Sequence, residues 1–413
     1  MSEQTPTWSR LTARLVRGEH LQHTEASWAM DEIMTGEASP VPLAGFLVAL
    51  QAKGVSSSEL EALADSMVAH ARPVAVERHA IDIVGTGGDL AQTVNISTMA
   101  SIVIAASGRT VVKHGNRAST SRSGSADVLE ALGVRLDLPV PEVERLVGEV
   151  GMTFLFAQVF HPSMRFAAEA RKGLGIPTVM NILGPITNPA RPLASAVGVA
   201  DPAIAPTVAG VFASRGTSAL VFRGQDGLDE LTVSAASDVW EVRGGEVRSH
   251  LLDPTALLGI PRSPHDALRG GTAEENAQVA RDLYAGARDG RMGPIRDAVL
   301  LNAAAGILAH DGIGKPAADG FEDRFRAAHA EAVSTLDSGA PSTLLARWAA
   351  TSQESLAANG LADRHDRSTP SRTDAVLGRP PPGGEVRSSR APGALSPRDP
   401  GRRRRRGHAW SRS

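Results

Sequence analysis

The stretch DIVGTGGDLAQTVNIST, residues 82–98, begins inside a short apolar run and leads into a helix-forming segment. The run AIDIV at 80–84 has the apolar composition of a strand, and 97–108 (STMASIVIAASG) is predicted as a buried helix that ends at Gly108. A strand, a glycine-rich loop and a helix in this order are typical of a parallel sheet in an α/β protein. Ligands of such sheets bind beyond the carboxyl ends of the strands, so this loop is a candidate binding site.

The same alternation continues toward the carboxyl end of the chain. Further strands are predicted at 110–116, 153–157, 195–200 and 218–224, and helices at 124–133, 162–175, 272–286 and 294–310. Thr272 and Glu275 are spaced as a capping box for the helix that follows them. These elements predict a domain at 76–353 that is built on a mostly parallel central sheet flanked by helices.

The amino-terminal part has a different pattern. The segments 41–50 and 56–67 repeat apolar residues at helical spacing, as in Leu43, Phe46, Leu47 and Leu50. Ser39 and Pro40 mark the predicted start of the first of these helices, and Gly54 marks its end. The fold class is therefore α/β, with a small helical domain at 1–75, joined by later helices near 140–200, in front of the larger α/β domain.

Composition narrows the class of protein. The 413 residues are 42% hydrophobic and include no cysteine, which excludes disulfides and thiolate metal sites. We find no secretory signal and no apolar run of the ~18 residues that a membrane span needs, so we expect a cytoplasmic protein without a membrane partner. The segment 354–413 is rich in proline and arginine, including GRRRRRG, and is predicted to be disordered. Aromatic residues do not interleave with these arginines, so nucleic acid is not the expected partner.

Three polar loops are predicted at the carboxyl ends of strands. GTGGD at 85–89 offers backbone N–H groups that can cradle phosphate oxygens, although a plain tight turn has the same composition. KHGNRASTSRSGSAD at 113–127 concentrates cations and hydroxyls that suit a pyrophosphate, or it is a solvated surface loop. Asp229 and Glu230 in QDGLDE are hard oxygen ligands of the kind that Mg²⁺ prefers, or a surface acid pair.

Asp89 is unexpected in a phosphate-binding loop, because its charge repels phosphate. A divalent cation at the same site removes this objection, since the ion reverses the local charge balance. A carboxylate also accepts hydrogen bonds from sugar hydroxyls. The three loops together therefore indicate a phosphorylated sugar that carries pyrophosphate and Mg²⁺.

The chain resembles the anthranilate phosphoribosyltransferase family over roughly residues 10–353. The resemblance rests on GTGGD…TVNIST, KHGNRA…SGSADVLEALG, FHPSMRFAAEARKGLGIPTVMNILGPITNP and DGLDELT, which occur in order. It implies a homodimer joined through the helical domains, and Mg²⁺ as the cofactor. It also implies a reaction in which phosphoribosyl pyrophosphate and anthranilate give N-(5-phosphoribosyl)anthranilate and pyrophosphate in tryptophan biosynthesis.

The resemblance also implies site residues. Contacts with phosphoribosyl pyrophosphate are expected from Gly85, Gly88, Asp89, Thr93, Asn95, Ile96, Ser97, Thr98, Lys113, His114, Gly115, Asn116, Arg117, Ala118, Ser119, Thr120, Ser121 and Ser125. Ser97, Asp229 and Glu230 are expected to hold the metal, and Gly85, Asn116 and Arg171 to contact anthranilate. His114 has a supporting role, and no residue is needed as a nucleophile.

Helical spacing gives a second reason to expect Arg171 in the site. Within the predicted helix 162–175 it is spaced to share a face with Met164 and Leu174, so it is expected to point inward. The sequence departs from the family pattern at Leu90, Thr120, Met180 and Arg223, none of which removes a charged site residue. Two alternatives remain at this stage: a pyrimidine nucleoside phosphorylase of the same fold, and a non-catalytic relative that binds nucleic acid.

Overall fold

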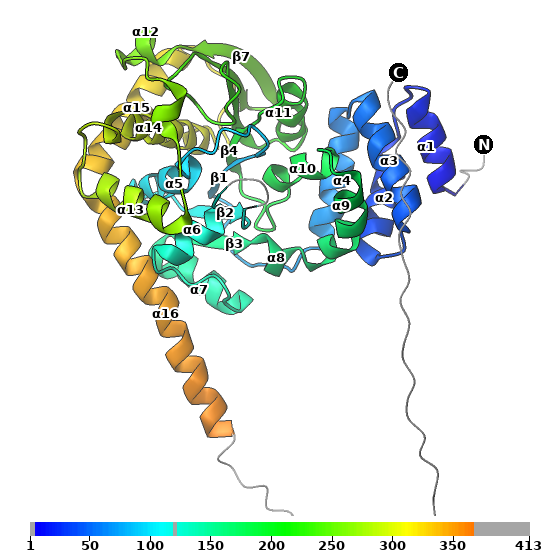
Figure 1. The fold of residues 1–413 in the computed structure, drawn as a ribbon, viewed down its shortest axis with the longest axis horizontal. Helices are drawn as coiled ribbons and strands as arrows, with labels where there is room; N and C mark the ends of the chain where they lie inside the picture. Colours follow the sequence, from blue (N-terminus) through cyan, green and yellow to red (C-terminus); the bar gives the residue numbers. More distant parts are fainter. Residues whose placement is uncertain (1–4, 119–121, 367–413) are drawn as a thin grey trace, which may run out of the picture. The chain divides into compact units, whose positions relative to one another are not determined.

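The computed structural model describes residues 5–118 and 122–366 (Figure 1). Its first elements are the helices α1 (Trp8–Val16), α2 (His23–Thr35), α3 (Pro40–Lys53) and α4 (Ser57–Ala69). They bury Leu11, Ile33 and Phe46 in a shared apolar cluster. Ser39 and Gly54 flank α3 as predicted, and Gly54 takes the positive φ of 84° that favours glycine.

The sheet has seven strands in the order β3-β2-β1-β4-β5-β6-β7. Five of them are parallel to one another: β1 (Ile81–Gly85), β2 (Val111–Gly115), β3 (Met152–Phe156), β4 (Ala194–Gly198) and β5 (Ser218–Gly224). All five were predicted from apolar runs, and the expected mostly parallel sheet is confirmed.

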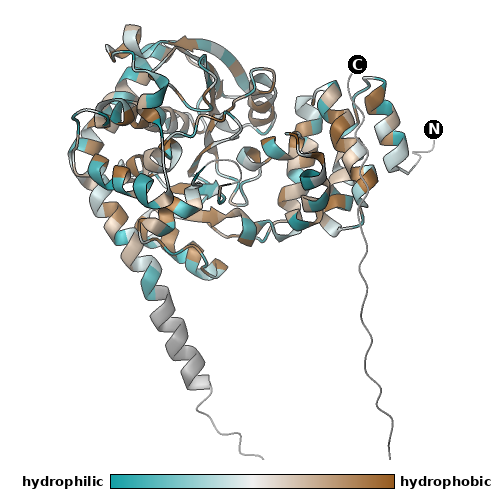
Figure 2. Ribbon diagram, in the orientation of Figure 1, coloured by the Kyte–Doolittle hydropathy of each residue, from teal (hydrophilic) through white to brown (hydrophobic). Residues whose placement is uncertain are grey.

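Two antiparallel strands at one end of the sheet were not predicted. β6 (Ser237–Arg243) pairs with β5, and β7 (Glu246–Leu252) pairs with β6. Each mixes charged and apolar residues, so neither has a continuous apolar run: Glu241 of β6 is buried, whereas Val247 and Leu251 of β7 are exposed. Figure 2 shows both hydrophilic and hydrophobic residues at this end of the sheet.

Helices cover both faces of the sheet. Leu220 and Phe222 of β5 pack in one cluster with α5 (Ile96–Ala106), α14 (Met292–Asp311) and α15 (Phe321–Asp337). Their neighbours Ala219 and Val221 point to the opposite face, which is covered by α11 (Ala205–Ser214). The cluster on the α11 side is continuous with the apolar cluster of the first four helices.

Shorter helices follow the remaining loops. They are α6 (Ser125–Ala131), α7 (Val140–Val150), α8 (Ala157–Phe160), α10 (Val179–Ile182), η2 (Gly184–Ile186), α12 (Pro254–Leu258), η3 (His265–Leu268) and α13 (Ala273–Tyr284). At the start of α13, Thr272 and Glu275 form the predicted capping box. The last helix, α16 (Ala340–Asp366), continues past Gln353, and the rest of the predicted disordered tail, 367–413, lies outside the described residues.

The single helix predicted at 162–175 was wrong in detail. A 3₁₀ helix, η1 (Pro162–Ala167), comes first and is followed by α9 (Ala168–Leu174). A 3₁₀ helix has three residues per turn, so positions in η1 and α9 do not follow one helical period. Arg171 therefore does not share a helical face with Met164 as predicted, whereas Leu174 lies in the short helix α9 together with Arg171.

The helix α14 is long and apolar enough to cross a membrane by length and composition alone. The sequence was not expected to contain such a segment, because Arg296 and Asp297 interrupt its apolar residues. In the structure, 78% of its most apolar window is buried. α14 packs between α5, α15 and the sheet, so it is a core helix of the described fold.

The strand order reverses between β1 and β4. The chain proceeds from β1 to β2 and β3 on one side, and then returns to place β4 on the other side of β1. Gly85 and Gly198, the last residues of β1 and β4, are paired in register at this point. A crevice beyond the carboxyl ends of two such strands is where ligands of open α/β sheets bind.

Candidate active site

Asp229 lies against the two glycines at the reversal of strand order. A Cβ atom at Gly85 would come within 2.2 Å of Oδ2 of Asp229, and one at Gly198 within 1.6 Å of its backbone oxygen. Only glycine lets Asp229 approach this closely. The N–H of Gly87 donates a hydrogen bond of 2.7 Å to Oδ2 of Asp229. The loops that follow β1 and β5 therefore meet at the crevice, as the sequence predicted.

The acid pair is buried. Asp229 and Glu230 are each 8% exposed. Burial, together with the neighbouring Asp89 carboxyl, raises the pKa of Asp229 to about 8. Burial and the charge of Asp229 raise the pKa of Glu230 well above its ordinary value, against the opposing effect of Lys113. Asp89 thus adds negative charge beside the buried acid pair, and a cation would offset this charge.

Lys113 lies beneath the start of α5. Its side chain is 1% exposed, and Nζ donates to the carbonyl of Ile83 and, at 3.3 Å, to Oγ of Ser97. Burial lowers the pKa of Lys113, while the charges of Asp82 and Glu230 oppose this effect. Lys113 therefore lies between Ser97, to which it donates, and the charge of Glu230, and its expected contact with the ligand stays a prediction.

His114, the next residue of β2, is held from both sides. The backbone N–H of His114 donates to Oδ1 of Asp82 at 3.1 Å, and the ring atom Nδ1 lies 3.1 Å from the carbonyl oxygen of Gly184. Because a carbonyl only accepts, Nδ1 carries the proton and Nε2 keeps a free lone pair. Burial lowers the pKa of His114 to about 3, and the nearby His161 adds to the effect. Nε2 is buried and has no hydrogen-bond partner among the described residues.

Asp82 was not predicted as a site residue, although it begins the quoted stretch. Its Oδ2 accepts a hydrogen bond of 2.9 Å from Nδ2 of Asn188, which also donates to the carbonyl of Val112. Burial raises the pKa of Asp82 to about 6. Asp82 and Asn188 fix the backbone of β2 beneath His114. Asn188 lies in NILGPITNP, which the sequence analysis used only as part of the resemblance.

The end of the first loop is tied to the second. Nδ2 of Asn95 donates to the carbonyl of Ser123 at 3.2 Å, and Oδ1 of Asn95 accepts from Nδ2 of Asn276 at 2.8 Å. Sequence reasoning missed Asn276, because its only signal was a place inside the capped helix 272–286. The carboxamide of Asn95 has protein partners, and its expected contact with the ligand stays a prediction.

Other predicted residues of the first loop shape its backbone. Gly88 has a φ of 91°, a backbone conformation that residues with a side chain rarely adopt. Thr93 pairs with Arg269 in an isolated antiparallel bridge. Ile96 and Thr98 are buried in the first turn of α5, and Oγ1 of Thr98 has no hydrogen-bond partner among the described residues.

The second loop is only partly described. Gly115 ends β2 and Ser125 begins α6, and the expected contacts at Ser119, Thr120 and Ser121 lie outside the described residues. Arg117 forms ion pairs with Asp127 at 2.9 Å and with Glu130 at 2.5 Å, so its charge is directed to α6.

Three further residues complete the predicted set. The N–H of Ala118 donates to Oδ2 of Asp127 at 3.1 Å, and Asn116 is exposed. Arg171 on α9 is half-buried, and its side chain has no hydrogen bond or ion pair with another described residue. Burial lowers the pKa of Arg171 from its ordinary value. A guanidinium in this situation is available for an anion.

The arrangement offers hard oxygen ligands beside backbone N–H groups and the first turn of an eleven-residue helix. Among the described residues, no group of three or more His, Asp or Glu is placed to hold a metal ion by itself. A cation bound between Asp229 and Glu230 would need further oxygens from its ligand, as Mg²⁺ takes from phosphates. The site can therefore bind a polyanion and a divalent cation together.

Two family descriptions match the chain. "Glycosyl transferase family, a/b domain" matches residues 77–340, and "Glycosyl transferase family, helical bundle domain" matches residues 9–71. Two relatives carry the name anthranilate phosphoribosyltransferase. That of Arthrobacter sp. (strain FB24) is 56% identical over 344 residues, covering 83% of this chain and 96% of the relative. That of Rhodococcus jostii (strain RHA1) is 56% identical over 343 residues, covering 83% and 92%.

Solved structures of the same enzyme are similar in fold. Anthranilate phosphoribosyltransferase from Thermus thermophilus matches with a TM-score of 0.75 and 42% identity, covering 83% of this chain and 99% of the other. The enzyme from Saccharomyces cerevisiae in complex with PRPP and Mg matches with a TM-score of 0.74 and 26% identity, covering 84% and 98%.

Proposed function

The chain belongs to the anthranilate phosphoribosyltransferases of the glycosyl transferase family, and from this we propose how its crevice at the β1–β4 reversal performs the reaction. The enzyme transfers the phosphoribosyl group of phosphoribosyl pyrophosphate to the amine of anthranilate in tryptophan biosynthesis. The observation that supports this location most directly is Asp229, seated against Gly85 and Gly198 and hydrogen-bonded to the glycine loop. The pyrophosphate lies along the loops that follow β1 and β2.

Mg²⁺ is the proposed cofactor, held by Asp229, Glu230 and the hydroxyl of Ser97. The raised pKa values of the two carboxyls fit this assignment, because a buried acid pair is costly to ionise unless a cation accompanies it. When bound, Mg²⁺ neutralises charge on the departing pyrophosphate. Lys113 keeps the Ser97 hydroxyl in place through its 3.3 Å hydrogen bond.

The reaction exchanges two bonds at one ribose carbon. The bond from C1 of the ribose to the pyrophosphate oxygen breaks, and a bond from the amine nitrogen of anthranilate to C1 forms, with loss of a proton from nitrogen. The aromatic amine is neutral at pH 7 and needs no strong base before attack. Orientation supplies roughly 7–11 kcal/mol in well-placed reactions, against ~10²–10⁴-fold for general acid–base help. Positioning and charge stabilisation by the loops therefore dominate.

Anthranilate is proposed to lie near Gly85, Asn116 and Arg171, with its carboxylate on the guanidinium of Arg171. His114 supports this pose. Its neutral ring is buried and Nδ1 donates to the carbonyl of Gly184, so His114 holds the end of β2, next to Asn116, against that segment. A pKa of about 3 makes His114 a weak base, so its part is orientation.

The proposal is tested by following anthranilate fluorescence with phosphoribosyl pyrophosphate, with and without EDTA. We expect Mg²⁺-dependent loss of signal in the wild type and loss of at least ~100-fold in rate for Asp229→Asn, since a buried charge partner of the cation is removed. Asp289→Asn, an exposed acid on the loop before α14, is the matched control and should keep full activity.

Two alternative functions make different predictions in the same assay. A pyrimidine nucleoside phosphorylase would cleave thymidine or uridine with inorganic phosphate and leave anthranilate untouched. A nucleic-acid-binding relative would show no turnover and would bind DNA at physiological salt. The relatives named anthranilate phosphoribosyltransferase, at 56% identity, favour the first reaction over both.

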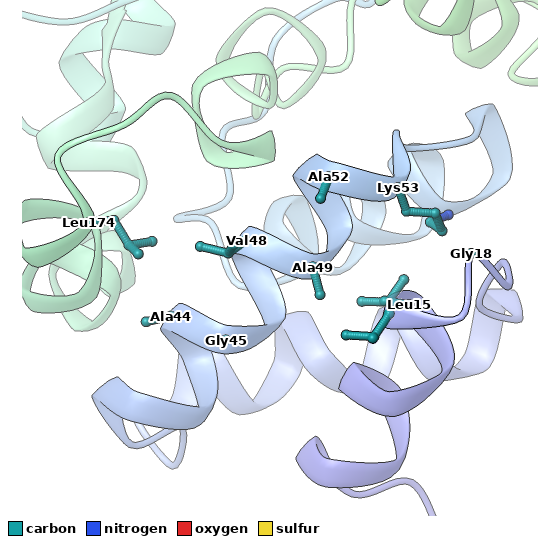
Figure 3. Close-up of a pocket in the computed structure, with 10 residues that line it drawn as sticks. Leu15, Gly18, Ala44, Gly45, Val48, Ala49, Ala52, Lys53 and Leu174 are labelled. Carbon is teal, nitrogen blue, oxygen red and sulfur yellow. The ribbon is translucent and has the colours of Figure 1, made fainter.

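We further propose that the enzyme is a cytoplasmic homodimer joined through its helical domains. A surface cavity of about 640 Å³ lies between α1, α3 and α9, where Ala44 and Val48 lie toward Leu174 and Ala49 lies toward Leu15 (Figure 3). Nearby, Val16 is 74% exposed and Val41 is 83% exposed. Exposed apolar patches of this kind mark protein interfaces. Light scattering of the wild type and of Val41→Glu, which should be monomeric, tests the assembly.

A further inference from the structure

Asn276, near the start of α13, uses both amide donors and its carbonyl oxygen in hydrogen bonds. The residue is 3% exposed. Its Oδ1 accepts from the N–H of Gly271 at 2.8 Å, and its Nδ2 donates to Oδ1 of Asn95 at 2.8 Å and to Oγ of Ser123 at 3.0 Å. Because a backbone N–H can only donate, Oδ1 must face Gly271, and this fixes Nδ2 toward the other two residues.

The three partners belong to three different loops. Asn95 precedes the first turn of α5, at the end of the glycine loop, and Ser123 ends the loop after β2. Gly271 belongs to a segment that runs beside the glycine loop. Here the N–H of Gly270 donates to the carbonyl of Gln92 at 2.7 Å, and the N–H of Val94 donates to the carbonyl of Leu268 at 2.9 Å. One buried carboxamide thus joins both proposed phosphoribosyl loops to a third.

We infer that Asn276 is a positioning residue for phosphoribosyl pyrophosphate, which it serves by holding the loops after β1 and β2 at a fixed separation. The inference rests on the proposed binding of the donor along these loops. Asn95 and Ser123 also bond to each other, through Oγ of Ser123 and Oδ1 of Asn95 at 3.2 Å. Their side chains are therefore committed to this junction, and the ligand meets backbone N–H groups and the hydroxyls that lie beyond it.

An asparagine is needed at this position for a chemical reason. The junction requires two donors toward oxygen atoms and one acceptor toward an N–H, and a carboxamide provides all three. Aspartate has the same shape but no donor, so it would set an oxygen against Oδ1 of Asn95. Alanine would leave Gly271 N–H and Asn95 Oδ1 without this partner in a buried place. Both substitutions remove hydrogen bonds that join the loops, and neither changes a group that is proposed to contact the ligand.

The experiment measures steady-state kinetics of Asn276→Asp, varying each substrate separately in saturating Mg²⁺. We expect KM for phosphoribosyl pyrophosphate to rise roughly 10- to 100-fold, because two buried hydrogen bonds are lost. KM for anthranilate and kcat should stay within about threefold, since no group that contacts anthranilate or the reacting carbon changes. Gln278→Ala, on the exposed side of the same helix, is the matched control and should leave all three constants unchanged.

A second readout is independent of turnover. Phosphoribosyl pyrophosphate with Mg²⁺ should raise the Tm of the wild type, and a weaker donor site in Asn276→Asp should reduce this rise at equal ligand concentration. If Asn276→Asp does not fold, Ser123→Ala removes one partner of the same junction and should show the same selective rise in KM. A folded Asn276→Asp with an unchanged KM for the donor, or with kcat and both KM values altered alike, would overturn the inference.

The wild type separates this inference from the proposed function. If the wild type does not consume anthranilate with phosphoribosyl pyrophosphate, the proposed function fails. If the wild type is active and Asn276→Asp binds the donor normally, only the role of Asn276 fails.

Discussion

The backbone N–H of Gly87 donates a hydrogen bond of 2.7 Å to Oδ2 of Asp229, a residue 142 positions later in the chain. This contact joins the glycine loop after β1 to the acid pair after β5. It also answers why a carboxylate belongs beside a phosphate-binding loop. Asp229 orders the backbone of the glycine loop through this hydrogen bond, and it is one of the acids that we propose as ligands of Mg²⁺.

Gly198 should not tolerate a side chain. A Cβ atom there would lie 1.6 Å from the backbone oxygen of Asp229, so the chain at Asp229 would have to move. We expect Gly198→Ala to lower the free energy of unfolding by about 1–3 kcal/mol, as overpacking does, and to reduce kcat. Chemical denaturation and kinetics measure the two effects.

Gly148→Ala is the control for this substitution. Gly148 lies inside α7, and a Cβ atom there meets nothing within 4 Å. Alanine is favoured over glycine in a helix, so this variant should be stabilised by roughly 0.5–1 kcal/mol. Equal stability of the two variants would contradict the close approach of Asp229 to Gly198.

Asn302 should control the apparent affinity for Mg²⁺. Its Nδ2 donates to the carbonyl of Leu231 at 2.9 Å, and its Oδ1 accepts from the N–H of Leu231 at 3.0 Å, directly after the acid pair. Asn302→Asp replaces the donor with an oxygen and frees this segment. We expect the Mg²⁺ concentration for half-maximal activity to rise about tenfold, which corresponds to ~1.4 kcal/mol. Activity that excess Mg²⁺ does not restore would argue against this role.

The elements that could be predicted have dense local signals. β1 to β5 are apolar runs bounded by glycine or polar loops, α3 and α13 have end signals at Ser39, Gly54 and Thr272, and α14 is a long apolar segment. β6 and β7 lack such runs, because charged and polar residues interrupt their apolar ones. The break between η1 and α9 was also hidden, since both segments contain residues that favour a helix.

The site residues also divide into those with a local sequence signal and those without one. The loops themselves are recognisable, because glycines, cations and acids cluster in a few residues. The residues that hold the loops are single asparagines and one glycine: Asn188, Asn276, Asn302 and Gly198. Each acts on a partner that is distant in sequence, as when Asn276 bonds to Asn95. A lone polar residue in a helix has no periodicity that would reveal such a partner.

His114 should make the protein sensitive to acid. Its pKa in the folded protein is about 3, below its ordinary 6.5, so the unfolded chain binds a proton in this interval and the folded protein does not. The stability that this group contributes is therefore present above pH 6.5 and lost as the pH falls toward 3. The slope is at most ~1.4 kcal/mol per pH unit.

The measurement is the difference in free energy of unfolding between wild type and His114→Asn across pH 4 to 7. The free energy of unfolding of the wild type should fall relative to that of His114→Asn as the pH falls. The groups around His114 act in both directions: the pKa of His161 is also lowered by burial, whereas that of Asp82 is raised to about 6. The comparison with the variant cancels these common effects. A difference that is constant with pH would show that His114 titrates normally.

Replacing Leu90 by glycine should maintain or increase the stability of the protein. It has a φ of 59° and a side chain that is 78% exposed, so it adopts a costly left-handed conformation and gains little burial. The left-handed region costs roughly 1–2 kcal/mol for a residue with Cβ, against a glycine penalty of about 0.5–1 kcal/mol in the unfolded chain. Leu90→Gly should therefore be neutral or stabilised by up to ~1.5 kcal/mol in thermal unfolding.

Leu251 on β7 provides the contrast for Leu90. It is 61% exposed and lies in a strand without a positive φ. Leu251→Gly should be destabilised by about 0.5–1 kcal/mol. If Leu90→Gly loses as much stability as Leu251→Gly, the backbone at Leu90 is not strained.

Arg171 should determine the use of anthranilate. Its guanidinium is half-buried and has no described partner, and burial has already lowered its pKa, so an arriving carboxylate would gain a charge-assisted pair of hydrogen bonds. Such a bond contributes about 1.5–3 kcal/mol, so Arg171→Ala should raise KM for anthranilate roughly 10- to 150-fold and leave KM for phosphoribosyl pyrophosphate unchanged. Arg171→Lys should recover only part of the affinity, since an ammonium lacks the planar fork.

Lys172→Ala, which removes the exposed neighbouring cation, controls for a general loss of positive charge on α9. Equal effects of Arg171→Ala and Lys172→Ala would show that α9 attracts the substrate by charge alone, without a specific carboxylate contact at Arg171.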